Sequence, residues 1–148
     1  MIKTLPLEIF YIYFSPYTSH AIELDGYLYP TVEHAYQCQR YKDKKIIDEI
    51  RNAHSPVKSW ETSCKYKQFQ VADFKDEKYK RKIMKNLMRL KLEQHNEIRE
   101  ALKNTGDLEI VKRIVTYPPG DGFWDIGEDG KGENQMGKIW MELREEIL

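Results

Sequence analysis

The sequence has few of the features that mark specialised classes of protein. Only two cysteines occur among its 148 residues, Cys38 and Cys64, and neither belongs to a C-x-x-C pair or a Cys/His cluster. A disulfide framework and a zinc site are therefore not expected. No apolar run approaches the ~18 residues that a membrane-spanning helix needs. The N-terminal stretch carries one early basic residue and an internal Glu8, unlike a signal peptide, so we expect a cytoplasmic protein without a membrane partner.

Net charge is also absent, because 24 Lys and Arg residues balance 24 Asp and Glu residues. A protein that binds nucleic acid mainly through the phosphate backbone needs a basic excess, so zero net charge disfavours that class. The charges are unevenly distributed along the sequence, however. Residues 65–91 hold ten basic and three acidic residues, whereas residues 121–148 hold eight acidic and three basic ones. The first segment can therefore attract a phosphorylated ligand although the whole chain is neutral.

What the sequence does contain is the composition of a globular protein, with 41% hydrophobic and 12% aromatic residues. The length fits one domain, and no repeat or linker interrupts it. We predict an α+β fold: a single compact domain over residues 1–148, mostly helical around a small β-sheet. The predicted strands are 9–14, a hairpin over 21–30 that turns at Asp25-Gly26, and 108–115. The predicted helices are 32–41, 44–53, a short one from Ser55-Pro56, 75–93, 95–103 and 135–147.

Three polar residues share one face of the helix that Thr31 is expected to cap. Glu33, Gln37 and Arg40 stand at positions i, i+4 and i+7, while apolar side chains cover much of the opposite arc. Two interpretations are open. The three residues form a solvated stripe with an internal Glu–Arg pair, or they face a ligand.

A lysine interrupts the apolar face of the predicted helix 75–93. In helical projection Lys91 falls among Leu87, Met84 and Met88. It either snorkels outward past the helix end or points into a pocket, where it meets an anion or a reacting carbon. Both interpretations stay open from the sequence.

A glycine- and acid-rich loop covers residues 118–134, with the sequence PPGDGFWDIGEDGKGEN, and is called the glycine loop below. It holds five of the eight glycines. Successive backbone amides in such a loop can form an anion-binding nest, and Trp124 offers a surface on which a base can stack. The spacing matches neither an EF-hand nor a phosphate-binding Walker or Rossmann motif. A solvated, turn-rich loop is the alternative, although loops of this length in compact domains are more often functional.

Three segments carry a family resemblance, and they follow one another in the family's order over nearly the whole chain: LDGYLYPTVEHAYQCQRY, KLEQHNEIREALKNTGD and GDGFWDIGEDGKGENQMGKIWMELRE. Their E-H-x-x-Q and W-x-x-G-x-x-G-x-G-x-N-x-x-G blocks resemble the NADAR domain family, also called YbiA-like. The resemblance implies a compact α+β fold and an N-glycosidase that hydrolyses the C–N bond between ribose and a base, with no cofactor and no metal.

The family has more than one branch, and each implies a different partner. One branch acts on small phosphorylated ribosyl compounds, the ribosylaminopyrimidine phosphates of the riboflavin pathway. Another removes ADP-ribose from guanine in nucleic acid. The family was also proposed to bind ADP-ribose or NAD-derived ligands, which keeps a non-catalytic binding module open. No oligomeric state is predicted.

The resemblance also implies site residues. It places the motif carboxylate at Glu33 and Lys91 in the family's K-x-x-Q segment. We expect Glu33 to stabilise charge on the sugar or to activate water, Asp121 or Asp125 to assist, and Lys91 to hold the phosphate or attack ribose as an amine. The expected substrate-binding residues are Gln37, Arg40, Trp124, Gly127, Asp129, Gly130, Lys131, Gly132 and Asn134.

The chain departs from the family pattern at several positions. The S-N-F segment reads Ser15-Pro16-Tyr17, and the W-G-x-G segment reads Trp124-Asp125-Ile126-Gly127. Arg40 stands where the family has lysine, and Phe74 where it has tryptophan. Arginine keeps the charge of lysine but loses amine chemistry, so these departures bear on the substrate more than on the glycosidase reaction.

Overall fold

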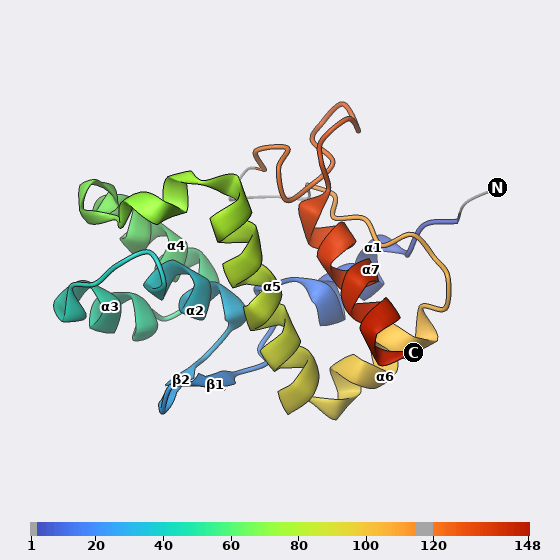
Figure 1. The fold of residues 1–148 in the computed structure, drawn as a ribbon, viewed down its shortest axis with the longest axis horizontal. Coiled ribbons are helices and arrows are strands. Elements are labelled where there is room, and N and C mark those ends of the chain that lie inside the picture. The colour runs from blue at the N-terminus through green and yellow to red at the C-terminus, as the bar shows by residue number, and fades with distance from the viewer. Residues whose placement is uncertain (1–2, 115–119) are drawn as a thin grey trace. The chain divides into compact units, whose positions relative to one another are not determined.

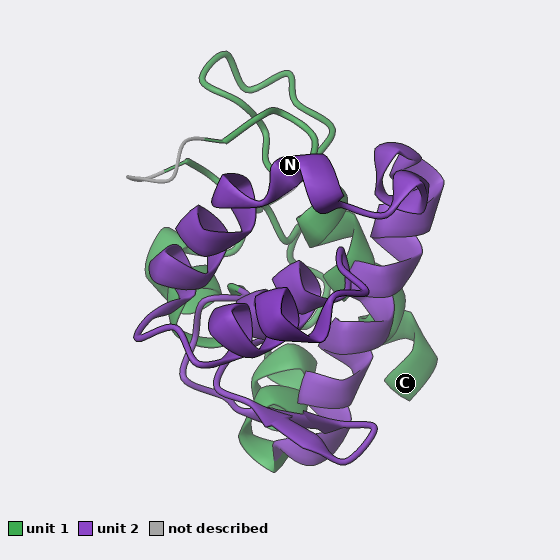
Figure 2. Ribbon diagram, turned by 90° about the vertical axis from the view of Figure 1, so that its left-hand side faces the viewer, with its two compact units in different colours: residues 1–15, 96–148 green, residues 16–95 purple. Residues whose placement is uncertain are grey.

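The structure is a computed structural model that describes residues 3–114 and 120–148. The chain divides into two compact units, which Figure 2 distinguishes by colour: Met1–Ser15 with Asn96–Leu148, and Pro16–His95. Helices dominate both units, and the described residues contain one two-stranded sheet. The predicted α+β, mostly helical fold is therefore confirmed. None of the described helices is long and apolar enough to cross a membrane.

A tight hairpin opens the unit Pro16–His95. Strands β1 (Ile22–Leu24) and β2 (Tyr27–Tyr29) pair in antiparallel register, with Ile22 opposite Tyr29. The turn between them places Asp25 at φ 52° and Gly26 at φ 84°. Two successive left-handed residues are what a two-residue hairpin loop requires, which explains why Asp-Gly predicted it correctly.

Three short helices follow the hairpin and pack against one another (Figure 1). They are α2 (Val32–Cys38), α3 (Lys44–Arg51) and α4 (Pro56–Lys65). Thr31 and Ser55 cap α2 and α4 as predicted, and Asp43 caps α3 in the same way. Each side chain accepts a hydrogen bond from a backbone amide of the first turn. Helix α2 ends at Cys38, three residues before the predicted position.

The long helix α5 (Glu77–Gln94) packs against both α2 and β1. Two short 3-10 turns lead into it, η2 (Lys67–Phe69) and η3 (Ala72–Lys75). Its apolar side is buried as predicted, with Met84, Leu87 and Met88 nearly inaccessible to solvent. This packing places Lys91, on the same side, inside the unit.

In the other unit, the predicted strand 9–14 is wrong. Residues 7–14 form α1 (Leu7–Ile9) and η1 (Phe10–Phe14), a π-helical turn closed by a 3.0 Å hydrogen bond from Ser15 N to Phe10 O. Phe10 and Phe14, one helical turn apart, are fully buried, whereas Ile12 between them is 54% exposed. A short run of aromatic and β-branched residues fits either period, and tertiary packing selects the helical one here.

The predicted strand 108–115 is also wrong over its described residues, 108–114, and residue 115 lies outside the described part. The stretch makes one isolated parallel bridge, between Thr4 and Glu109. Part of its backbone bonds to the glycine loop, since Ile126 N donates to Lys112 O at 3.0 Å. The apolar pattern there reflects the burial of Ile110 and Val111 and not a strand.

Helices α6 (Asn96–Asn104) and α7 (Gln135–Ile147) complete this unit. The predicted apolar stripe of α7 is buried at Met136, Ile139, Trp140 and Leu143. Trp140 fills volume against the Phe14 ring, 5.0 Å away, and its Nε1 also donates to Phe14 O at 2.9 Å. The helix that follows the glycine loop is thus firmly anchored.

Candidate active site

The centre of the candidate site in the unit Pro16–His95 is a pair of residues on α2. Glu33 is 5% exposed and Gln37 is 4% exposed. Gln37 Nε2 donates to Glu33 Oε2 at 2.7 Å, as expected for side chains one helical turn apart. Every residue of α2 is buried, so the solvated-stripe interpretation is wrong for this pair. A carboxylate held out of water and oriented by a donor is suited to chemistry rather than to solubility.

The third residue of the predicted face, Arg40, lies beyond the end of α2. Its guanidinium donates to Gln70 Oε1 at 2.8 Å and to the Tyr36 hydroxyl at 3.1 Å. It also lies over two aromatic rings, 4.9 Å from the centre of Tyr36 and 5.0 Å from that of Phe74. The Arg40 guanidinium is therefore held by Gln70 and by two aromatic rings. One of these rings, Phe74, stands at the position where the family has tryptophan.

Lys91 is fully buried, at 0% exposure, so the snorkelling interpretation is wrong. Its Nζ donates to Thr18 Oγ1 at 2.6 Å. A buried ammonium needs hydrogen-bond partners to offset the loss of water, and the Thr18 hydroxyl supplies one of them. The structure thus supports the other interpretation, in which Lys91 points inward.

The segment Pro16–His20 contacts both α2 and α5. Pro16 O accepts a 3.0 Å hydrogen bond from the backbone amide of Glu33, and Thr18 accepts from Lys91. Thr18 Oγ1 also lies 2.6 Å from Nδ1 of His20. Sequence reasoning missed Thr18 and His20, because a loop has no periodicity to place them. The one available signal was the departure at Ser15-Pro16-Tyr17, immediately before Thr18.

His34, the histidine of the E-H-x-x-Q block, has a structural position. Its Nε2 lies 3.0 Å from Ala53 O, which only accepts, so Nε2 carries the proton and donates. Its Nδ1 lies 2.8 Å from the Thr31 hydroxyl. Burial lowers the pKa of His34, which favours the neutral ring. His34 thereby joins the start of α2 to the segment after α3.

In the other unit, the carboxylates of the glycine loop bind the loop's own backbone. Asp125, 1% exposed, accepts at Oδ1 from the amides of Gly122, at 3.1 Å, and Gly127, at 2.8 Å. The exposed Asp121 accepts from Phe123 N and Asp129 accepts from Lys131 N, both at 2.9 Å. The expected anion-binding nest is therefore wrong for these four amides, because internal carboxylates already occupy them. Residues 118 and 119 of the predicted loop lie outside the described residues.

Asn134 fastens the base of the glycine loop. It adopts a left-handed backbone with φ 52°, and its side chain is buried. Its Oδ1 accepts from Lys112 N at 2.9 Å and its Nδ2 donates to Ile110 O at 3.0 Å. Nearby, burial and the charge of Asp125 raise the pKa of Tyr11, whose hydroxyl donates to Arg113 O. Asn134 and Asp125 thus both hold the loop in shape.

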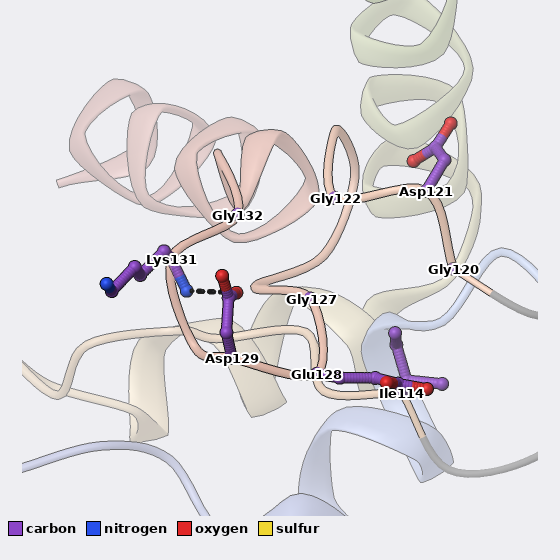
Figure 3. A pocket seen from close by; sticks show the side chains of 9 residues that line it. All are labelled: Ile114, Gly120, Asp121, Gly122, Gly127, Glu128, Asp129, Lys131 and Gly132. Carbon is purple, nitrogen blue, oxygen red and sulfur yellow. Dashed lines mark hydrogen bonds between the residues drawn. The ribbon is translucent and has the colours of Figure 1, made fainter.

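An open cleft of about 580 Å³ lies along the glycine loop (Figure 3). Its lining residues are Ile114, Gly120, Asp121, Gly122, Gly127, Glu128, Asp129, Lys131 and Gly132. Figure 3 shows Lys131 and Asp121 extending outward on opposite sides of the loop. Of the predicted site residues in the loop, four do not line this cleft: Trp124, Asp125, Gly130 and Asn134. The ring of Trp124 packs edge-on against Phe123, with ring centres 4.7 Å apart.

The charge of this cleft is mainly negative, since its lining contains three carboxylates and one lysine. Such a lining stabilises positive charge better than it binds a phosphate. Among the described residues, no three His, Cys, Asp or Glu side chains are grouped as a metal site would need.

Known proteins resemble this chain over most of its length. It is 33% identical to N-glycosidase YbiA of Escherichia coli, over 90% of this chain and 80% of that protein. An N-glycosidase of Nostoc punctiforme is 35% identical, over 90% of this chain and 84% of its own length. A riboflavin biosynthesis protein of Vibrio vulnificus is 31% identical, over 86% of this chain but only 33% of that protein.

The solution structure of E. coli YbiA superposes with a TM-score of 0.78 at 32% identity, covering 90% of this chain and 76% of that one. The sequence profile of the NADAR domain matches residues 7–148. That range contains the pair on α2, Lys91 on α5 and the whole glycine loop, so the match covers every candidate residue described above. The chain belongs to the NADAR domain family.

Proposed function

We propose that this chain hydrolyses the bond between ribose C1 and the base nitrogen in a phosphorylated ribosylamine, such as the ribosylaminopyrimidine phosphates of the riboflavin pathway. The chain is an N-glycosidase, because it belongs to the family and matches relatives of that name over most of their length. The name of the Vibrio relative supports the choice of substrate, although the match covers one third of that protein.

The observation that carries the proposal is the buried carboxylate of Glu33, oriented by Gln37 at 2.7 Å. Breaking a ribosyl C–N bond develops positive charge on the sugar, and a carboxylate near C1 stabilises that charge. In the hydrolytic route the C–N bond breaks, its electron pair leaves with the base, and water adds to C1. Glu33 either stabilises the sugar cation or accepts the proton that this water loses.

Lys91 offers a second way to break the same ribose C–N bond. Its neutral amine adds to C1, the base leaves with the C–N electron pair and takes up a proton, and the opened ribose remains bound as an imine. Water then hydrolyses the imine, releasing ribose phosphate and restoring the amine. The inward position of Lys91 supports this route, because its side chain is out of solvent and its Nζ is held by the Thr18 hydroxyl.

The loop residues keep the roles that the resemblance gave them, as part of this proposal. Asp121 is exposed and lines the cleft, whereas Asp125 is buried and bonded by two amides. We therefore assign leaving-group assistance to Asp121 and loop geometry to Asp125. Arg40, in the same unit as Glu33 and Lys91, contacts the phosphate, and Trp124 and Lys131 remain predictions as substrate-binding residues of the loop.

A chromatographic screen of the purified protein tests the substrate. It compares base release from a ribosylaminopyrimidine phosphate, from an oligonucleotide with ADP-ribosylated guanine, and from NAD. The proposal predicts release from the first substrate. Release only from modified guanine would overturn it in favour of nucleic-acid repair, and tight binding without any release would indicate a non-catalytic module.

Borohydride trapping separates the two routes. If the amine route operates, reduction during turnover leaves ribose phosphate covalently attached to Lys91, and mass spectrometry of the digested protein locates it there. A protein that turns over substrate but yields no adduct uses the water route. Lys91→Arg is the matched control, since it keeps the charge but has no amine that can form the imine.

A further inference from the structure

Three side chains in the unit Pro16–His95 form a continuous hydrogen-bonded row. Lys91 Nζ lies 2.6 Å from Thr18 Oγ1, and the same oxygen lies 2.6 Å from Nδ1 of His20. An ammonium group only donates, so Lys91 donates to Thr18. When His20 is neutral and carries its proton on Nε2, its Nδ1 accepts the hydroxyl proton of Thr18. In this tautomer the row runs in one direction, from Lys91 to His20.

The row runs from the interior to the surface. Lys91 is 0% exposed, whereas Thr18 and His20 are both partly exposed. An ammonium group has no lone pair and cannot attack carbon, so the amine route needs a path by which Lys91 loses a proton. Thr18 provides a hydroxyl that both accepts and donates, and histidine is the side chain best suited to exchange protons near neutral pH.

The surrounding backbone holds His20 in place. His20 N donates to Thr18 O at 2.8 Å, which folds the segment back on itself. The ring of His20 meets the ring of His95 edge-on, with centres 5.1 Å apart. His95 in turn bonds through Nε2 to Ala21 O at 2.5 Å. The imidazole of His20 is thus positioned by the loop on one side and by the end of α5 on the other.

We propose that Thr18 and His20 form a proton relay that converts the Lys91 ammonium into the nucleophilic amine, an inference that rests on the amine route of the proposed function. Lys91 passes one proton to Thr18 Oγ1 while Thr18 passes its own proton to His20 Nδ1. Lys91 becomes a neutral amine and His20 becomes an imidazolium, which releases its Nε2 proton to water. No electrons are transferred. Exchange with water then moves the remaining proton of His20 from Nδ1 back to Nε2, so that Nδ1 can accept again and Thr18 is again a hydroxyl.

Other ionisable side chains lie on the elements that pack against α5 and at its end. The charged or titratable residues on α2, β1 and η3 and at the end of α5 are Glu33, His34, Tyr36, Cys38, Glu23, Asp73, Lys75, Glu93 and His95. Of the acids among them, Glu33 is the buried one, and Gln37 bonds it. Variants that test the relay must therefore leave Glu33 and Gln37 unchanged.

The first test needs no substrate. In protein labelled with ¹⁵N-lysine, NMR measures the rate at which the Lys91 Nζ protons exchange with water. Thr18→Val and His20→Gln are expected to slow this exchange by about tenfold or more, because each removes one proton-transferring group. Thr18→Ser restores the hydroxyl and is expected to exchange like the wild type. The controls are Ser19→Ala, which lies between Thr18 and His20 in the chain, and His54→Gln, a histidine outside the row; both positions are exposed.

The second test measures borohydride trapping of Lys91 with the ribosylaminopyrimidine phosphate between pH 5 and pH 9. In the Thr18→Val and His20→Gln variants, the relay predicts that borohydride trapping at Lys91 is about tenfold slower than in the wild type at neutral pH. The trapping rate should recover as the pH rises, because hydroxide then removes the Lys91 proton directly. A purely structural role would slow trapping equally at every pH and would not distinguish Thr18→Ser from Thr18→Val.

The two tests distinguish a failure of the proton relay from a failure of the proposed N-glycosidase reaction. If base is released but the two relay variants keep wild-type exchange and trapping rates, the relay is wrong and the N-glycosidase stands. Equal slowing in Thr18→Ser and Thr18→Val also overturns the relay. If no substrate releases its base, the proposed function fails, and the exchange rates alone then decide whether Thr18 and His20 conduct the Lys91 proton. Circular dichroism and thermal midpoints establish that each variant is folded.

Discussion

Gln37 donates its side-chain amide to the carboxylate of Glu33 at 2.7 Å, one helical turn away and out of contact with water. This hydrogen bond fixes the position of one carboxylate oxygen on α2. A reaction that develops positive charge at a sugar carbon depends on such fixed, desolvated negative charge. The pair therefore links the local spacing of the E-H-x-x-Q block to the proposed chemistry.

Replacing Gln37 tests this orientation. Gln37→Met keeps the length of the side chain but removes the amide donor. A hydrogen bond to a charged group contributes about 1.5 to 3 kcal/mol, so we expect kcat for base release to fall by about tenfold or more. Gln39→Met, at the C-cap of α2, is the matched control and should stay near the wild type. Equal losses in the two variants would contradict an orienting role for Gln37.

Asp125 should matter more for stability than Asp121. Asp125→Ala leaves two loop amides without their acceptor in a buried position, which should lower the free energy of unfolding by about 1 to 3 kcal/mol. Asp125→Asn keeps an oxygen at the same place and should cost less. Urea denaturation measures all three variants. A loss at Asp121→Ala as large as that at Asp125→Ala would contradict the assignment of loop geometry to Asp125.

Local signals in the sequence predicted the elements whose cause is local. The caps Thr31 and Ser55 and the Asp25-Gly26 turn lie where expected, because each depends on a few neighbouring residues. The aromatic run 9–14 fits both a strand and a helix, because six residues are too few to distinguish the two periods. The helix is selected by packing, which buries Phe10 and Phe14 one helical turn apart and places Phe14 against Trp140.

The candidate site was predictable in its spacing but not in its surroundings. The i, i+4 relation placed Glu33 and Gln37 on one face correctly. Their burial follows from the packing of α3, α4 and α5 around α2, and no pattern within α2 itself reveals it. Likewise, the apolar arc singled out Lys91, whereas its partner Thr18 comes from a loop 73 positions away.

The stability of the protein should fall in mild acid because of His34. Its pKa is lowered from 6.5 in the folded state by burial, so the unfolded chain binds the proton more tightly. Above about pH 6.5 the ring is neutral in both states and its contribution is complete. As the pH falls below that value, the unfolded state is protonated first and the free energy of unfolding declines until the folded pKa is reached.

Urea denaturation at pH 7.5 and pH 5.5 checks this behaviour. The decline between the two values should be larger for the wild type than for His34→Gln, which retains a donor toward Ala53 O but does not titrate. His54→Gln, at an exposed position, should decline like the wild type. If His34→Gln and the wild type lose the same stability between the two pH values, His34 is not the group responsible.

The most direct test of the central claim is chromatographic measurement of base release from a ribosylaminopyrimidine phosphate by the wild type and by Glu33→Gln. Glutamine keeps the shape of glutamate but neither carries negative charge nor accepts a proton from water. We expect the wild type to release the base and Glu33→Gln to lose about two orders of magnitude or more in kcat, with a thermal midpoint close to that of the wild type. A folded Glu33→Gln that releases the base at the wild-type rate would contradict the account.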